Sequence, residues 1–208
     1  MAPFAAEHAH PPAYDGRRFK SKGFILIKYL GSKRVLVPVL GDLLTASEAR
    51  TALDLFTGTT RVAQEFCRRG AYTTAVDIAT YSEVLAQCYV VADAEQVPRG
   101  DIEDAIRRLE LLPPVRGYFT QTFCEDSRYF QPKNGRRIDA IRDGIDRFYG
   151  DDPLRPVLLT SLLEAADAVD STVGVQMAYL KSWSARANHD LKMRIPKLTP
   201  GTGAAVRG

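Results

Sequence analysis

The stretch that decides the fold runs from residue 51 to residue 78 and reads TALDLFTGTTRVAQEFCRRGAYTTAVDI. The apolar run ALDLF is followed by a TGTT turn and then by RVAQEFCRR, which has helical spacing and a natural stop at Gly70. AYTTAVDI is a second β-rich run that ends in an acid, and YSEVLAQCYVVADA after it has the pattern of a helix. The order strand, glycine turn, helix, strand, acid, helix predicts the start of a parallel α/β sheet.

Two acids and one glycine stand where the strands of such a sheet would end. Asp54 closes the first run, and Gly58 in the turn allows a ligand to approach the backbone. Asp77 closes the second run, where an acid about 20 residues past a glycine turn is placed to bind the two hydroxyls of a ribose. The sequence has neither GxGxxG nor GxxxxGK[ST], which disfavours a dinucleotide and a phosphate-loop nucleotidase. Among adenosine-containing ligands, those without a polyphosphate remain as candidates, and S-adenosylmethionine is one of them.

Outward from this stretch, the chain divides into four predicted regions. Residues 1–18, rich in Ala, Pro and His, are predicted to be a flexible lead-in, and residues 19–100 an α/β cofactor-binding domain. Residues 101–195 are predicted to be mostly helical, because GRRIDAIRDGIDRFYG and its neighbours have helical period. Residues 196–208 are rich in Gly, Pro and Ala, and we expect a linker-like tail. Before the deciding stretch, an apolar segment is closed by Pro38.

Three segments together resemble the adenine-specific DNA methyltransferases that modify the exocyclic N6 amine. They are KYLGSK (28–33), ALDLFTGTTRVAQEFCRRG (52–70) and AVDIATYS (75–82). The family has an N-terminal aromatic-x-Gly-x-Lys segment, an Asp-Leu-Phe-x-Gly turn and an acid after the second strand, all of which hold the cofactor. Matched by position, the resemblance implies cofactor-binding roles for Tyr29, Gly31, Lys33, Asp54, Phe56, Gly58, Asp77 and Tyr81.

The resemblance also implies the reaction and the partner. S-adenosylmethionine is the expected cofactor, and double-stranded DNA the expected substrate. The expected fold is a partial Rossmann-like methyltransferase sheet, in which residues 101–195 form a helical insertion that reaches DNA. Two basic stretches, 128–142 and 181–197, each hold five basic residues against one acid. A solvated helix face is an equally good interpretation of either. Within the first stretch, the predicted phosphate contacts are Arg128, Lys133, Arg136 and Arg137.

Two departures from the family pattern bear on catalysis. Thr60 stands where many relatives carry a second glycine, and the tetrapeptide Asp/Asn-Pro-Pro-Tyr/Phe does not occur among the 208 residues. We therefore expect no catalytic residue in this chain, no methyl transfer by the chain alone, and a catalytic half that was cut away or lost. The candidate protein partners are that missing half and a restriction subunit. Two alternatives stay open: a non-catalytic remnant or split subunit, and an unrelated adenosine-binding α/β enzyme.

Composition narrows the class of protein. Hydrophobic residues make up 45% and charged residues 25%, the proportions of an ordinary soluble globular protein. No apolar run reaches the roughly 20 residues of a membrane span, and the start lacks a basic segment followed by an apolar one, so we expect a cytoplasmic protein without membrane contact. Three widely spaced cysteines support neither a disulfide framework nor a zinc site, and Cys67 and Cys88 are predicted to be core residues. The expected chemistry requires no metal.

Overall fold

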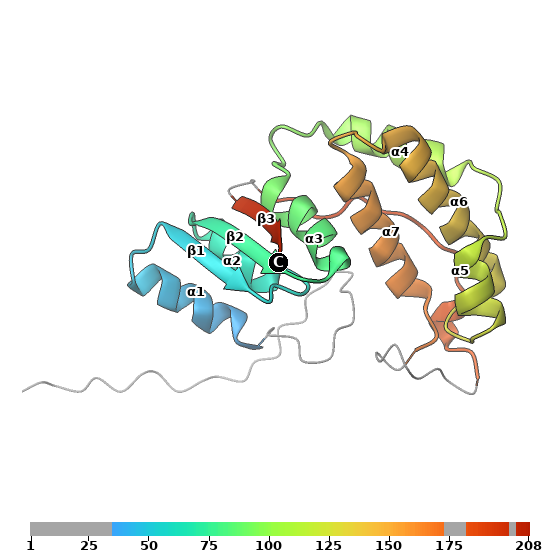
Figure 1. Cartoon of the computed structure of the whole chain (residues 1–208), viewed down its shortest axis with the longest axis horizontal. Coiled ribbons are helices and arrows are strands. Elements are labelled where there is room, and N and C mark those ends of the chain that lie inside the picture. Colours follow the sequence, from blue (N-terminus) through green and yellow to red (C-terminus); the bar gives the residue numbers. More distant parts are fainter. Residues whose placement is uncertain (1–34, 173–181, 200–202) are drawn as a thin grey trace, which may run out of the picture.

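The computed structural model describes residues 35–172, 182–199 and 203–208 (Figure 1). The lead-in at 1–18 and the predicted cofactor residues Tyr29, Gly31 and Lys33 lie outside the described residues. Figure 1 shows two neighbouring units, a small sheet with α1, α2 and α3 around it and an arm of helices that contains α4 to α7. No helix in the described ranges is long and apolar enough to cross a bilayer.

Three parallel strands form the sheet in the order β1-β2-β3. They are β1 (Thr51–Leu55), β2 (Tyr72–Asp77) and β3 (Gly203–Arg207). Between the first two lies α2 (Arg61–Arg68), which ends just before Gly70, a glycine with a φ of +89°. The predicted strand, turn, helix and strand are therefore confirmed, and the fold is a mixed α/β structure with a small three-stranded parallel sheet.

The tail differs from the prediction, because part of the expected linker at 196–208 forms a strand. Within residues 196–208, β3 pairs in parallel with β2, with Val76 opposite Val206. A side chain at Gly203 would overlap the Thr73 carbonyl and the Val90 side chain. Glycine and alanine are thus the residues that let β3 lie this close to its neighbours, and the same small residues made the segment look like a linker.

One face of the sheet is covered by helices. The helix α2, together with α3 (Thr80–Ala86) and the π-helical turn η2 (Gln87–Val91), buries small side chains against the strands. Cys67 and Cys88 are buried, which confirms the prediction that both are core residues. On the other face, Leu53 is 57% and Leu55 53% exposed within the described structure.

The helix α1 (Val37–Ala46) packs on α2. Pro38 lies in the first turn of α1 and does not close the apolar segment as expected, since a proline at that position needs no hydrogen-bonded N–H. Arg69 joins the two helices, because its guanidinium bonds Asp42 and Glu65, each at 2.9 Å.

The helical arm has the larger core. It consists of α4 (Arg99–Glu110), α5 (Tyr118–Thr120), η3 (Gln121–Glu125), α6 (Pro132–Tyr149), α7 (Arg155–Val169) and η4 (Ala185–Asn188). Ile138, Ile141 and Ile145 of α6 are buried, as their helical spacing predicts. The arm contacts the sheet unit mainly through α7, which packs against α3 and η2.

Candidate functional site

Asp54 shapes the turn that follows β1. Its side chain is only 5% exposed, and its Oδ2 accepts hydrogen bonds from the Thr57 hydroxyl at 2.9 Å and from the Ala63 amide at 3.2 Å. The Ala63 amide belongs to the first turn of α2, where backbone N–H groups have no partner within the helix. Asp54 therefore holds the turn against α2, and its direct contact with a cofactor stays a prediction.

The turn has an unusual backbone. Phe56, Gly58 and Thr60 all adopt positive φ angles, of +63°, +54° and +61°. This region suits glycine and is uncommon for bulky or β-branched residues, whose presence there marks ligand sites and other strained positions. Thr60 fits because its hydroxyl donates to the Thr59 carbonyl and accepts from Gln64 Nε2, each at 2.8 Å. The position where many relatives carry glycine thus keeps the glycine conformation.

The outer surface of the turn is open. Phe56 is 81% exposed, and no atom of the described residues lies within 4 Å of the place where a Cβ of Gly58 would stand. A ligand can therefore lie directly against the backbone at Gly58.

Asp77 at the end of β2 faces this turn. Its Oδ2 accepts a hydrogen bond from the Gly58 amide at 2.8 Å, and its Oδ1 accepts one from the Ala79 amide at 3.0 Å. Burial raises the pKa of this carboxyl, but the backbone N–H groups of Ala79, Gly58 and Ile78 outweigh that effect and hold the pKa below its ordinary value. The group is thus ionised at neutral pH. Such a carboxylate fits the two hydroxyls of a ribose.

Tyr81 follows Asp77 in the first turn of α3 and is 37% exposed. It lines a cleft of about 640 Å³ between α3 and the helical arm, on whose opposite side stands Tyr118. Phe56, Gly58 and Asp77 therefore lie at the carboxyl ends of two adjacent parallel strands, and Tyr81 follows in the first turn of α3. Ligands of open α/β sheets bind at this edge.

The third strand ends at the same edge, which the sequence analysis missed. Arg207 lies opposite Asp77 in the register of β2 and β3, and the Gly208 amide donates to the Asp77 carbonyl at 3.2 Å. The only local signal was the short run AAV between glycines.

Comparison with models of known protein families shows which family has this sequence pattern. A model described as D12 class N6 adenine-specific DNA methyltransferase matches residues 29–205. The chain belongs to this family.

Curated relatives agree with the D12 class assignment. The chain is 35% identical over 137 residues to the type II methyltransferase M.NlaIII of Neisseria lactamica, a match that covers 62% of this chain and 40% of that protein. It is 27% identical to the modification methylase StsI of Streptococcus sanguinis, over 81% of this chain and 28% of that protein. With the type II methyltransferase M.CviAII of Paramecium bursaria Chlorella virus 1 it shares 30% identity, over 77% of this chain and 51% of that protein.

The chain spans about a quarter to a half of the length of these relatives. No solved structure shows significant similarity to the chain.

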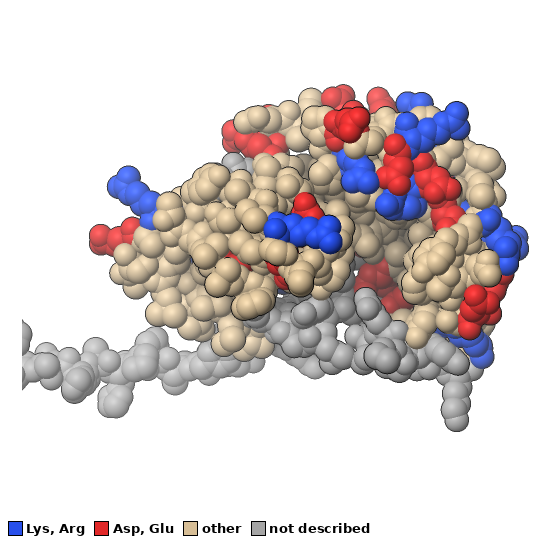
Figure 2. All heavy atoms as spheres, in the orientation of Figure 1, with Lys and Arg blue, Asp and Glu red and all other residues tan. Residues whose placement is uncertain are grey.

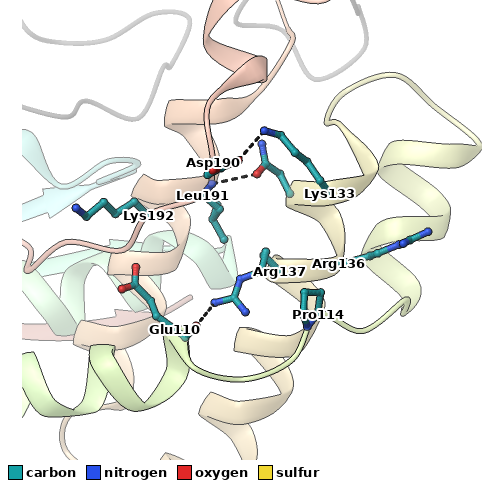
Figure 3. Close-up of a pocket in the computed structure, with 9 residues that line it drawn as sticks. Glu110, Pro114, Lys133, Arg136, Arg137, Asp190, Leu191 and Lys192 are labelled. Carbon is teal, nitrogen blue, oxygen red and sulfur yellow. Dashed lines mark hydrogen bonds and ion pairs between the residues drawn. The ribbon is translucent and has the colours of Figure 1, made fainter.

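The four basic residues that are predicted to contact phosphate have different neighbours in the structure. Lys133 binds Asp190 at 2.6 Å and the Asn188 carbonyl at 2.8 Å, whereas Arg137 donates to the carbonyls of Glu110 and Leu112 at the end of α4 (Figure 3).

Arg136 is exposed and lines the same groove as Lys133 and Arg137, from which its side chain points away in Figure 3. Arg128 does not line that groove, and its guanidinium lies 5.0 Å from the centre of the Trp183 ring. The structure therefore brings three of the four residues together, and phosphate binding by all four stays a prediction.

In the described ranges of the D12 class chain, no three His, Cys, Asp or Glu side chains are grouped as they would be to hold a metal ion.

Proposed function

We propose that this chain is the cofactor-binding part of a protein that transfers the methyl group of S-adenosylmethionine to the N6 amine of adenine in double-stranded DNA. The observation that carries the proposal is the pairing of the Asp77 carboxylate with the open Gly58 turn, at the ligand-binding edge of the sheet of a D12 class chain. The names of the relatives support DNA modification in a restriction-modification setting, with a restriction subunit as a candidate partner. We place such a protein in the cytoplasm.

The residues at the site fit S-adenosylmethionine. Asp77 would accept the ribose hydroxyls, while Phe56 and Tyr81 offer exposed aromatic surface beside it. Open space at Gly58 would allow the cofactor to lie close to the turn. When bound, S-adenosylmethionine supplies an electrophilic methyl group on its sulfonium.

Methyl transfer needs a further element. The adenine amine is a poor nucleophile, because its lone pair is delocalised into the ring, and the base must leave the double helix to be reached. In the family, the Asp/Asn-Pro-Pro-Tyr/Phe tetrapeptide binds that amine and stacks on the base, and this sequence does not contain it. We propose that this chain binds the cofactor and contacts DNA, while the tetrapeptide comes from additional sequence or from a partner.

A second candidate function is binding without catalysis, and the absence of the tetrapeptide favours it. In this case the chain would hold cofactor or DNA as a remnant or as the subunit of a split enzyme. The reading frame after codon 208 separates the two candidates, because a frame that continues into an Asp/Asn-Pro-Pro-Tyr/Phe string supports methyl transfer by the same polypeptide.

Calorimetric titration of the chain with S-adenosylmethionine tests the cofactor proposal, and transfer of a tritiated methyl group to unmethylated duplex DNA tests catalysis. We expect weak cofactor binding and no transfer. Absence of binding would overturn the cofactor assignment. Tight stoichiometric binding by a stable monomer would contradict the expected weakness, and transfer would show that the tetrapeptide is dispensable.

A further inference from the structure

The segment from residue 189 to residue 197, HDLKMRIPK, presents two basic side chains in an alternating pattern. Leu191 and Met193 are buried, at 9% and 3% exposure, whereas Lys192 and Arg194 are exposed. Extended backbone sends successive side chains to opposite sides, so the apolar pair anchors the segment while the basic pair points outward. Within the described ranges, the side chains of Lys192 and Arg194 make no hydrogen bond or ion pair.

Polar side chains of α4 and α6 hold the backbone of this segment. Asn134 on α6, only 1% exposed, donates to the His189 carbonyl at 2.9 Å and accepts from the Leu191 amide at 3.0 Å. Glu110 on α4 accepts from the Met193 amide at 2.9 Å.

A third helix contributes as well, because the Ser161 hydroxyl on α7 both donates to the Arg194 carbonyl, at 2.6 Å, and accepts from its amide, at 3.1 Å. Three helices therefore fix the backbone that carries Lys192 and Arg194, which lowers the entropy that these residues would lose on binding a partner.

A groove of about 660 Å³ lies on one side of the segment (Figure 3). Its charged residues are four bases, from α6 and the segment, against two acids: Lys133, Arg136, Arg137, Lys192, Glu110 and Asp190.

A second groove, also of about 660 Å³, lies between the segment and α4. It again holds four bases against two acids, which are Arg99, Arg107, Arg194, Lys197, Glu103 and Glu110. The formal charge of the whole chain is only +3. The excess of basic residues in the two grooves is therefore partly balanced by acidic residues elsewhere in the chain. On the face shown in Figure 2, the charged side chains lie chiefly over the helical arm.

We infer that this segment is a phosphate-binding ridge on which Lys192 and Arg194 contact the backbone of the DNA duplex, with one basic groove along its first half and another along its second half. The inference rests on the proposed function, which supplies DNA as the partner. A fixed row of cations suits a regular array of phosphates, and such contacts position a protein on DNA without reading its sequence. The basic ridge then keeps the helical arm on the duplex while the sheet edge holds the cofactor.

The test is equilibrium binding of the full chain to a fluorescent DNA duplex across a series of salt concentrations. Each phosphate contact contributes about 0.9 to the slope of log affinity against log salt, so Lys192→Ala/Arg194→Ala should lower the slope by about 1.8. At 0.1 M salt this corresponds to roughly eightfold weaker binding for each lost contact. The charge-keeping variant Lys192→Arg/Arg194→Lys should retain the slope of the unmodified chain.

The matched control is Arg50→Ala/Arg147→Ala, which removes the same charge from exposed residues outside both grooves. It should leave the slope within about 0.5 of the unmodified chain, because distant surface charges are screened. An unchanged slope in the Lys192/Arg194 variant, or an equal loss in the control, overturns the ridge while leaving the proposed function intact. Failure of the unmodified chain to bind duplex DNA overturns both the ridge and DNA as its partner, and cofactor titration then reports separately on the S-adenosylmethionine site.

Discussion

The backbone amide of Gly58 donates a hydrogen bond of 2.8 Å to Oδ2 of Asp77, which ties the turn after β1 to the end of β2. These residues lie 19 positions apart, and the parallel pairing of β1 and β2 brings them to one edge. The bond fixes the carboxylate at this edge of the sheet. The site is thus organised before any cofactor arrives.

Removal of the Asp77 charge should weaken the cofactor site. We expect Asp77→Ala to lower the affinity for S-adenosylmethionine about tenfold to a hundredfold, because hydrogen bonds to a charged group contribute about 1.5–3 kcal/mol. Isothermal titration calorimetry measures the effect. Asp101→Ala, an exposed acid in the first turn of α4, serves as the control and should bind normally. Unchanged affinity in Asp77→Ala would show that this carboxylate does not bind the cofactor.

Gly58→Ala tests the open turn. The new methyl group meets no atom within 4 Å in the part of the chain that the structure describes, so the expected cost to stability is that of the positive φ, about 1–2 kcal/mol. If the cofactor lies against this backbone, its affinity should also fall by at least about tenfold. Urea unfolding and cofactor titration report the two effects.

Gly100→Ala is the matched control, since Gly100 in α4 also has open space around its Cβ position and no positive φ. That change should be neutral or stabilising, by up to about 1 kcal/mol. Wild-type cofactor affinity in Gly58→Ala would show that the ligand does not approach this turn.

Tyr89 and Glu164 link the two units of the chain. The Tyr89 hydroxyl in η2 donates a hydrogen bond of 2.6 Å to Glu164 Oε1 on α7. Burial raises the pKa of Glu164, and the bond from Tyr89 opposes that rise. We expect a coupling free energy of about 1–2 kcal/mol from a double-mutant cycle of Tyr89→Phe and Glu164→Gln in urea. Additive single effects would mean that the contact does not hold the units together.

Asp139 should contribute to stability above acid pH. It accepts bonds from the amides of Gly117, Phe119 and Thr120 and from the Thr120 hydroxyl, at 2.6–2.9 Å. Burial raises the pKa of this carboxyl, but the donors outweigh it and hold the pKa below 3.8.

The stabilisation from Asp139 is therefore complete above about pH 5 and is lost as the pH falls through the folded-state pKa. Asp139→Asn should cost about 3 kcal/mol at neutral pH and flatten the acid limb of the stability profile measured by urea unfolding. Asp143→Asn, an exposed neighbour on α6, should change stability by less than about 0.5 kcal/mol. Equal stability profiles for Asp139→Asn and the unmodified chain would contradict this role.

The sequence by itself determined the parts of the protein that local pattern encodes. Apolar runs, turn chemistry and helical period predicted β1, α2 and β2, and parallel pairing implied that Gly58 and Asp77 would share one edge of the sheet. The resemblance of the motifs around these residues to those of adenine-specific DNA methyltransferases indicated the family.

Only the tertiary structure decided what each side chain contacts. Asp54 points inward and accepts a hydrogen bond from α2, and Arg137 donates to carbonyls at the end of α4. The Gly- and Ala-rich tail forms a third strand of the sheet. The tertiary structure also placed Lys192 and Arg194 on a fixed ridge between two basic grooves. These outcomes depend on partners far away in the sequence, such as Asn134 for Leu191 and Thr73 for Gly203, and no local period or propensity specifies such pairings.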